Sequence, residues 1–187
     1  MSEIILASQS PRRKQLLEWA EVDFEIMVAD TDESFPTNIP VEEVAVHVAT
    51  EKAKTIKAKA PGKIIIAADT IVVLHNEVIN KPVDRNDAIT ILSKLSGSHH
   101  KVITGVVITN EEKFVSFADT TDVEFHSLTQ SQIEFYVDKY KPYDKAGAYA
   151  IQEWIGVVGI KSINGDFYNV MGLPVSLVVQ QLKGLEG

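Results

Sequence analysis

The apolar run Ile64–Val73 has no polar alternation, unlike a strand that exposes one face to solvent. We interpret it as a central β-strand covered on both faces. Asp69 and Thr70 interrupt the run. An aspartate in such a place either caps a turn or acts as a base or metal ligand where the strand opens into a cleft. A turn at 75–77 returns the chain beside the strand and is expected to bring Lys81 near Asp69.

Helical periodicity is clearest after Pro40, where apolar residues form one face of a predicted helix. These residues are Val41, Val44, Ala45, Val48, Ala49, Ala53 and Ile56. Lys52 falls within the same stripe, whereas Lys54 and Lys57 lie away from its centre. A lysine in that place either extends its charged end to the edge of the core or reaches a buried anion. The pattern favours neither alternative.

A short strand at Ile4–Ala7 runs directly into a helix, which begins with Ser10 as N-cap and Pro11 at the first helical position. The free N–H groups at such a start attract anions. Arg12 and Arg13 lie in the first turn, where the helix dipole disfavours cations. They are therefore either solvated surface residues or partners of a bound phosphate.

Three acids follow a strand-like segment at Phe24–Val28, namely Asp30, Asp32 and Glu33. They form either a solvated loop or a ligand set for a hard cation such as Mg²⁺. The sequence does not choose among the three.

Several further elements are expected from the same signals. They are a helix at 84–97, a long hairpin of Val102–Ile108 and Phe114–Phe125 that could form a second lobe, a helix from Thr129 to Tyr140, a strand at Val157–Ile163 and a last helix from Pro174. The histidines at 99, 100 and 126 are expected at strand ends rather than on a metal, since no second ligand stands at a useful spacing.

Composition narrows the class of protein. The 187 residues, 45% of them hydrophobic, suffice for one well-filled core, so we expect a single compact domain with a cleft. A formal net charge of -8 argues against nucleic-acid and anionic-membrane partners. The absence of cysteine excludes disulfides and thiolate metal sites. No apolar run approaches the roughly 20 residues of a membrane span, and we expect a cytoplasmic protein.

Eight short motifs stand in a characteristic order along the chain. They are Leu6–Arg13, Glu33, Glu51–Ala53, Ala68–Thr70, Lys81–Pro82, Asp144–Tyr149, Ile151–Gln152 and Val170–Pro174. In this combination the chain resembles the Maf (septum formation protein) family of nucleoside triphosphate pyrophosphatases. The resemblance implies an inosine triphosphate pyrophosphatase-like α/β fold, with an elongated mixed sheet and two lobes flanking a cleft. It implies one Maf-like domain over residues 1–187.

The resemblance also implies an activity, the hydrolysis of a nucleoside triphosphate to the monophosphate and pyrophosphate with a divalent cation (Mg, Mn or Co). By position, Asp69 matches the proton acceptor, and Glu33 with Asp69 matches the metal site. The phosphate-binding positions match Ser8, Arg13, Lys52 and Lys81. One branch of the family prefers dTTP and UTP and also accepts modified pyrimidine nucleotides. The residues that characterise this branch correspond to Arg12, Thr70 and Gln152. A homodimer is compatible with these expectations.

One residue departs from the family pattern, since Glu153 follows Gln152 where a small residue, often Gly, is expected. Two other functions compete with the enzyme. A nucleotide-binding regulator of cell division without turnover remains open. A haloacid-dehalogenase-like phosphatase is disfavoured, because the segment Ala68–Val72 lacks that family's second aspartate.

Overall fold

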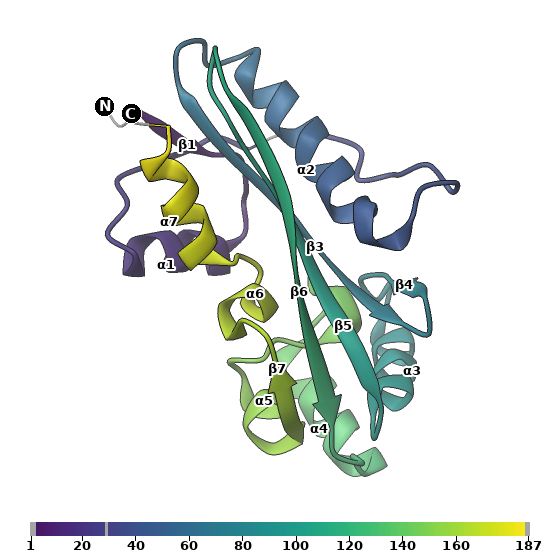
Figure 1. The fold of residues 1–187 in the computed structure, drawn as a ribbon. Helices are drawn as coiled ribbons and strands as arrows, with labels where there is room; N and C mark the ends of the chain where they lie inside the picture. Colours follow the sequence, from purple (N-terminus) through teal and green to yellow (C-terminus); the bar gives the residue numbers. More distant parts are fainter. Residues whose placement is uncertain (1–2, 29, 186–187) are drawn as a thin grey trace. The chain divides into compact units, whose positions relative to one another are not determined.

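The computed structural model describes residues 3–28 and 30–185, and Figure 1 shows how its elements follow one another. The ends of the predicted domain, residues 1–2 and 186–187, and position 29 lie outside the described residues. In chain order the elements are β1 (Ile4–Leu6), α1 (Pro11–Trp19), β2 (Glu25–Ile26), α2 (Val41–Lys57), β3 (Ile64–Leu74), β4 (Glu77–Ile79), α3 (Arg85–Leu95), β5 (His99–Thr109), β6 (Phe114–Phe125), α4 (Gln130–Tyr140), the single 3₁₀ turn η1 (Ala146–Ala148), α5 (Trp154–Gly159), β7 (Ile160–Asn164), α6 (Phe167–Met171) and α7 (Val175–Lys183). The predicted α/β class is confirmed.

The strands form a seven-stranded mixed sheet in the order β2-β1-β3-β5-β6-β7, with β4 paired to β3. Strand β1 runs parallel to β2 and β3, whereas β4 and β7 run antiparallel to β3 and β6. Strand β3 is the predicted central strand. Its residues Ile65–Ala68 are fully buried, and Asp69 and Thr70 are half-buried.

The chain divides into two compact units. The first unit comprises the chain up to Thr70, Thr104–Asp119 and the chain from Gly172 onward, and the second comprises Ile71–Ile103 and Thr120–Met171. Strands β3, β5 and β6 therefore contribute residues to both units. The hairpin of β5 and β6 is thus shared between the two units.

Within the first unit, α2 packs closely against the sheet, on the side opposite α1 and α7 (Figure 1). The core beneath it consists of Ile5, Ala7, Ala49, Ala53, Ile56, Ala60, Ile65, Ala67 and Val107. Gly105 on β5 permits this close approach, because a Cβ there would lie 2.2 Å from the backbone nitrogen of Val46. In the described part of the chain, no helix is both long and apolar enough to cross a membrane.

The second unit begins with the predicted return of β3. Strand β4 follows a two-residue turn at His75 and Asn76, whose φ angles of 50° and 65° suit the tight turns that join antiparallel strands. The caps of α3 and α4 are the predicted ones: the side chain of Asp84 accepts from Asp87 N, and Thr129 forms a capping box with Gln132.

The strand predicted at Val157–Ile163 is wrong in its first half, because α5 occupies Trp154–Gly159 and β7 begins only at Ile160. The backbone N–H groups of Gly156 and Val157 both donate to the carbonyl of Glu153, which starts a helical turn. Val157 is 83% exposed, so its β-branched side chain packs against no sheet neighbour. Local hydrogen bonds therefore override the β-propensity of the segment.

Candidate active site

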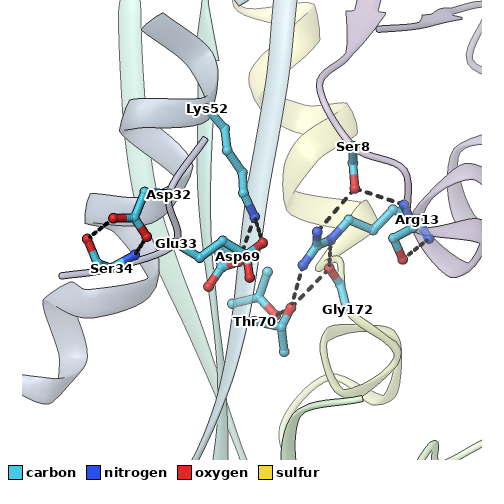
Figure 2. Close-up of polar contacts among 11 residues, drawn as sticks. Ser8, Arg13, Asp32, Glu33, Ser34, Lys52, Asp69, Thr70 and Gly172 are labelled. Carbon is cyan, nitrogen blue, oxygen red and sulfur yellow. Dashed lines mark hydrogen bonds and ion pairs between the residues drawn. The ribbon is translucent and has the colours of Figure 1, made fainter. Parts of the chain in front are cut away.

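The ammonium of Lys52 joins two carboxylates of the first unit (Figure 2). Its Nζ lies 2.8 Å from Asp69 Oδ1 and 2.8 Å from Glu33 Oε1. The side chains of Lys52 and Asp69 are only 10% and 15% exposed, whereas that of Glu33 is 47% exposed. Of the two alternatives that the helical pattern left open, Lys52 therefore adopts the one in which it reaches an anion.

The three members of this cluster come from elements of different rigidity. Lys52 lies on the buried face of α2, and Asp69 directly follows the fully buried part of β3. Glu33 comes from the segment between β2 and α2, whose described residues form no helix or strand. Two of the three groups are thus held by the core, as precise chemistry requires.

The structure also distinguishes among the three acids of that segment. Asp32 accepts hydrogen bonds from Ser34, at 3.0 Å from the backbone nitrogen and 2.8 Å from the hydroxyl. This arrangement is a local turn of the kind that short acids form with the next residues. Asp30 is exposed. Glu33 is the acid that pairs with Lys52.

Arg13 forms a second network on the other side of β3 (Figure 2). Its guanidinium donates to the carbonyl of Gly172 (2.7 Å), to Ser8 Oγ (3.2 Å) and to Thr70 Oγ1 (2.9 Å). These three partners are neutral, so none of these bonds cancels the charge of Arg13. Burial lowers the pKa of Arg13 below its ordinary value, and the charges of Asp69 and Glu33 oppose this shift. The guanidinium nevertheless remains a cation at neutral pH.

The start of α1 is built as the sequence predicts. Pro11 is the first helical residue, and Ser10 Oγ accepts from Arg13 N at 3.5 Å. Ser8 Oγ accepts from Ser10 N at 3.2 Å in addition to its bond from Arg13. The side chain of Ser8 thereby connects the end of β1 to the buried arginine.

The predicted site residues divide between the two units. The first unit brings together two networks that contain Ser8, Arg13, Glu33, Lys52, Asp69 and Thr70. Arg12 is half-buried in the first turn of α1, and its role stays a prediction. Lys81 and Gln152 are exposed residues of the second unit. Their proximity to the others stays a prediction from the resemblance.

Two members of the arginine network were not predicted. Thr104 is fully buried on β5, and its hydroxyl lies 2.9 Å from that of Thr70. A hydroxyl within the apolar segment 102–108 is the same signal that drew attention to Asp69, so the sequence offered a clue. Gly172 contributes a carbonyl group, for which a sequence carries no signal. Its backbone φ angle is +119°, a value that residues other than glycine rarely adopt.

The donor set suits a divalent cation only in part. Glu33 and Asp69 already share one cation, the ammonium of Lys52, so both can turn toward a common positive charge. Among the described residues, no group of three or more His, Cys, Asp or Glu side chains could hold a metal. Magnesium commonly binds to one or two carboxylates and completes its coordination with water and substrate phosphates. The residues present fit that mode and do not form an all-protein cage.

Comparison with known proteins identifies close relatives over almost the full chain. The family described as "Maf-like protein" matches residues 3–185. A protein of Cytophaga hutchinsonii named dTTP/UTP pyrophosphatase is 50% identical over 182 residues, which cover 97% of this chain and 84% of that protein. A protein of the same name from Bacteroides thetaiotaomicron is 47% identical over 185 residues, 98% of this chain and 96% of that protein.

Solved structures show the same fold at low sequence identity. A HAM1 protein from Coxiella burnetii superposes with a TM-score of 0.52 at 16% identity, over 98% of this chain and all of that chain. The Ham1 protein of Staphylococcus aureus gives a TM-score of 0.53 at 18% identity, over 97% of this chain and 98% of that one. At such identities the likeness concerns the fold alone.

Proposed function

We propose that this chain, which belongs to the Maf-like protein family, is a nucleoside triphosphate pyrophosphatase that acts on dTTP and UTP. The names of its relatives support the choice of substrate. The observation that carries the chemistry is Asp69, a carboxylate that directly follows the buried part of a central strand and lies 2.8 Å from the Lys52 ammonium.

In the proposed reaction, Asp69 accepts a proton from the attacking water. The water oxygen bonds to the α-phosphorus, the bond from that phosphorus to the α,β-bridging oxygen breaks, and pyrophosphate leaves. The products are the nucleoside monophosphate and pyrophosphate. No residue becomes covalently modified. In the nucleotide-free protein Lys52 orients Asp69, since its Nζ lies 2.8 Å from Asp69 Oδ1.

The phosphates need cations, since a triphosphate carries about three to four negative charges and the protein itself is acidic. We assign this role to Ser8, Arg13, Lys52 and Lys81. Selection of the base is assigned to Arg12, Thr70 and Gln152, because a guanidinium, a hydroxyl and an amide offer the donors and acceptors that a pyrimidine edge requires.

A divalent cation, Mg, Mn or Co, would be held by Glu33 and Asp69, where it would stabilise the negative charge that develops on the phosphates.

The test is a nucleotide panel with the purified protein, in which pyrophosphate and inorganic phosphate are measured separately. We expect steady release of pyrophosphate from dTTP and UTP, faster than from purine nucleotides.

Gln152→Ala should lower turnover of dTTP and UTP more than turnover of the purine nucleotides, because an amide that reads the base is lost. Equal losses for all bases would remove Gln152 from base selection. Saturable nucleotide binding without pyrophosphate release would favour the regulator over the enzyme.

A further inference from the structure

Lys52 already provides a cation to the two carboxylates of the candidate active site. Its Nζ lies within 2.8 Å of one oxygen of Glu33 and one oxygen of Asp69. A divalent cation held by the same two residues would lie close to the ammonium and be repelled by it. The ammonium and the metal ion therefore compete for the same pair of carboxylates.

We propose that Lys52 is a built-in competitor of the divalent cation and that nucleotide phosphates release this competition. Without nucleotide, Lys52 holds Glu33 and Asp69, and metal binds weakly. When a triphosphate binds, its oxygens draw the ammonium away and leave the two carboxylates to the metal. Metal and nucleotide consequently bind with positive cooperativity.

The charges of the cluster support the first part of the proposal, that metal binds weakly without nucleotide. Two carboxylates and one ammonium leave a net charge of about -1 in the cluster, and an incoming divalent ion also meets repulsion from the ammonium. The side chain of Lys52 is only 10% exposed, so solvent and salt screen this repulsion poorly. The competition is consequently stronger than it would be between exposed groups.

The buried stem of Lys52 prevents its ammonium from moving away from the carboxylates into solvent. Its stem lies on the buried face of α2, between Val48 and Ile56 one turn away on either side. A lysine anchored in this way needs a new anion when its carboxylates are taken. The phosphates of a triphosphate supply that anion, and this half of the inference rests on the proposed function.

The small number of protein ligands at the site supports the second part of the proposal, that nucleotide strengthens metal binding. In the described part of the chain, no third His, Cys, Asp or Glu side chain joins the pair to form a metal site. A metal bound to Glu33 and Asp69 alone has few protein ligands, and phosphate oxygens would complete its coordination. Nucleotide thus adds ligands for the metal and also removes its competitor.

The first test measures Mn²⁺ binding to the nucleotide-free protein by the loss of the free-ion EPR signal. Lys52→Met keeps the apolar stem and removes the charge, and we expect it to bind Mn²⁺ at least about tenfold more tightly than the parent. Lys54→Met is the matched control, because Lys54 lies on the same helix but is exposed and paired with Glu51. Its affinity for Mn²⁺ should equal that of the parent. Affinity that is unchanged or lower in Lys52→Met would overturn the proposal.

The second test locates the bound ion. In the double variant Lys52→Met, Glu33→Gln, the gain in Mn²⁺ affinity should disappear, because the site loses one of its two carboxylates. Persistence of the gain would place the ion elsewhere and contradict the proposal. Should Lys52→Met fail to fold by circular dichroism, Lys52→Gln replaces it with a neutral polar side chain, and the same comparison decides.

The third test measures cooperativity with a non-hydrolysable dTTP analogue. The analogue should tighten Mn²⁺ binding at least about tenfold more in the parent than in Lys52→Met, since the variant has no competitor to displace. Equal tightening in both proteins would overturn the release step. Failure of the proposed function is distinguishable, because the Mn²⁺ titrations need no hydrolysis: an inactive protein can still show the gain, and an active one can lack it.

Discussion

Asp69 and Thr70 are neighbours on β3, but their side chains belong to two different networks. Successive side chains of a strand point to opposite faces. Asp69 accordingly meets Lys52 from α2, and Thr70 meets Arg13 from α1. One dipeptide therefore directs a carboxylate and a hydroxyl to two separate cations, and a shift of register by one residue would exchange them.

His100 is a second residue whose environment is unusual. It is 3% exposed and packs against Phe125 and Tyr149, with ring centroids 5.3 and 5.5 Å away. Its Nε2 lies 2.7 Å from the Tyr149 hydroxyl, and within the described residues its Nδ1 has no hydrogen-bond partner. Burial lowers the pKa of His100 to about 4, with a smaller contribution from His99.

This shift predicts a loss of stability in acid. The native state keeps His100 neutral down to about pH 4, whereas the unfolded chain takes up the proton near pH 6.5. Between these values the unfolded state binds more protons, so the free energy of unfolding falls as the pH falls through this window. The loss that His100 alone causes is about 3 kcal/mol.

Urea denaturation at several pH values between 7 and 4 tests this prediction. His100→Gln keeps a polar group for Tyr149 but does not titrate. The parent should therefore lose more stability than the variant across this range. Carboxylates such as Glu51 and Asp138, whose pKa values are lowered by ion pairs, contribute equally to both proteins. Parallel curves for the two proteins would show that His100 is not the cause.

At the scale of elements, local signals predict structure well. The start of α1 at Ser10 and Pro11 and the capping box of α4 are read from adjacent residues and are confirmed. The buried stripe of α2 is confirmed with Lys52 inside it. These features depend on residues a few positions apart, and their physical causes lie within the element.

Features that depend on distant partners could not be predicted in the same way. The carbonyl that binds Arg13 belongs to Gly172, 159 residues further along the chain. Helix α5 forms where β-branched residues favour a strand, because the carbonyl of Glu153 accepts hydrogen bonds from the N–H groups of Gly156 and Val157. The choice of Glu33 over Asp32 depends on whether a side chain bonds to its own turn or to another element.

The segment that leads into α5 is held by Tyr136 of α4. The buried Tyr136 hydroxyl donates to Glu153 Oε2 and accepts from Ala150 N at 3.2 Å. Lys145 Nζ lies 3.8 Å from the other oxygen of Glu153. Through these contacts Glu153, the residue that the resemblance predicts to depart from the family pattern, fixes the segment that contains Gln152.

Tyr136→Phe should lower the free energy of unfolding by about 1–3 kcal/mol, because a buried N–H and a carboxylate lose their shared partner. Chemical denaturation measures the change. Tyr168→Phe removes the same hydroxyl from a side chain that is 44% exposed, and it should change stability by less than about 0.5 kcal/mol. If the two variants have equal stability, the Tyr136 hydroxyl does not brace this segment.

At the scale of the whole molecule, an acidic protein is proposed to bind a polyanion. The formal net charge of -8 repels a triphosphate at long range, so affinity has to come from cations at fixed positions. Arg13 and Lys52 are such cations, since both are largely buried and held by hydrogen bonds. The family match over residues 3–185 shows that the chain as a whole, rather than one segment, carries the likeness.

The central claim is that Asp69 activates the attacking water, and Asp69→Asn tests it most directly. Asparagine keeps the shape and can still contact Lys52 through its amide oxygen, so the thermal midpoint should change little. The measurement is turnover of dTTP at saturating metal, together with nucleotide affinity. We predict that kcat falls by at least about 10²-fold, as expected for the loss of a general base, while nucleotide affinity is kept or increased because a negative charge facing the phosphates is removed. A folded variant that turns over within a few-fold of the parent would contradict the account.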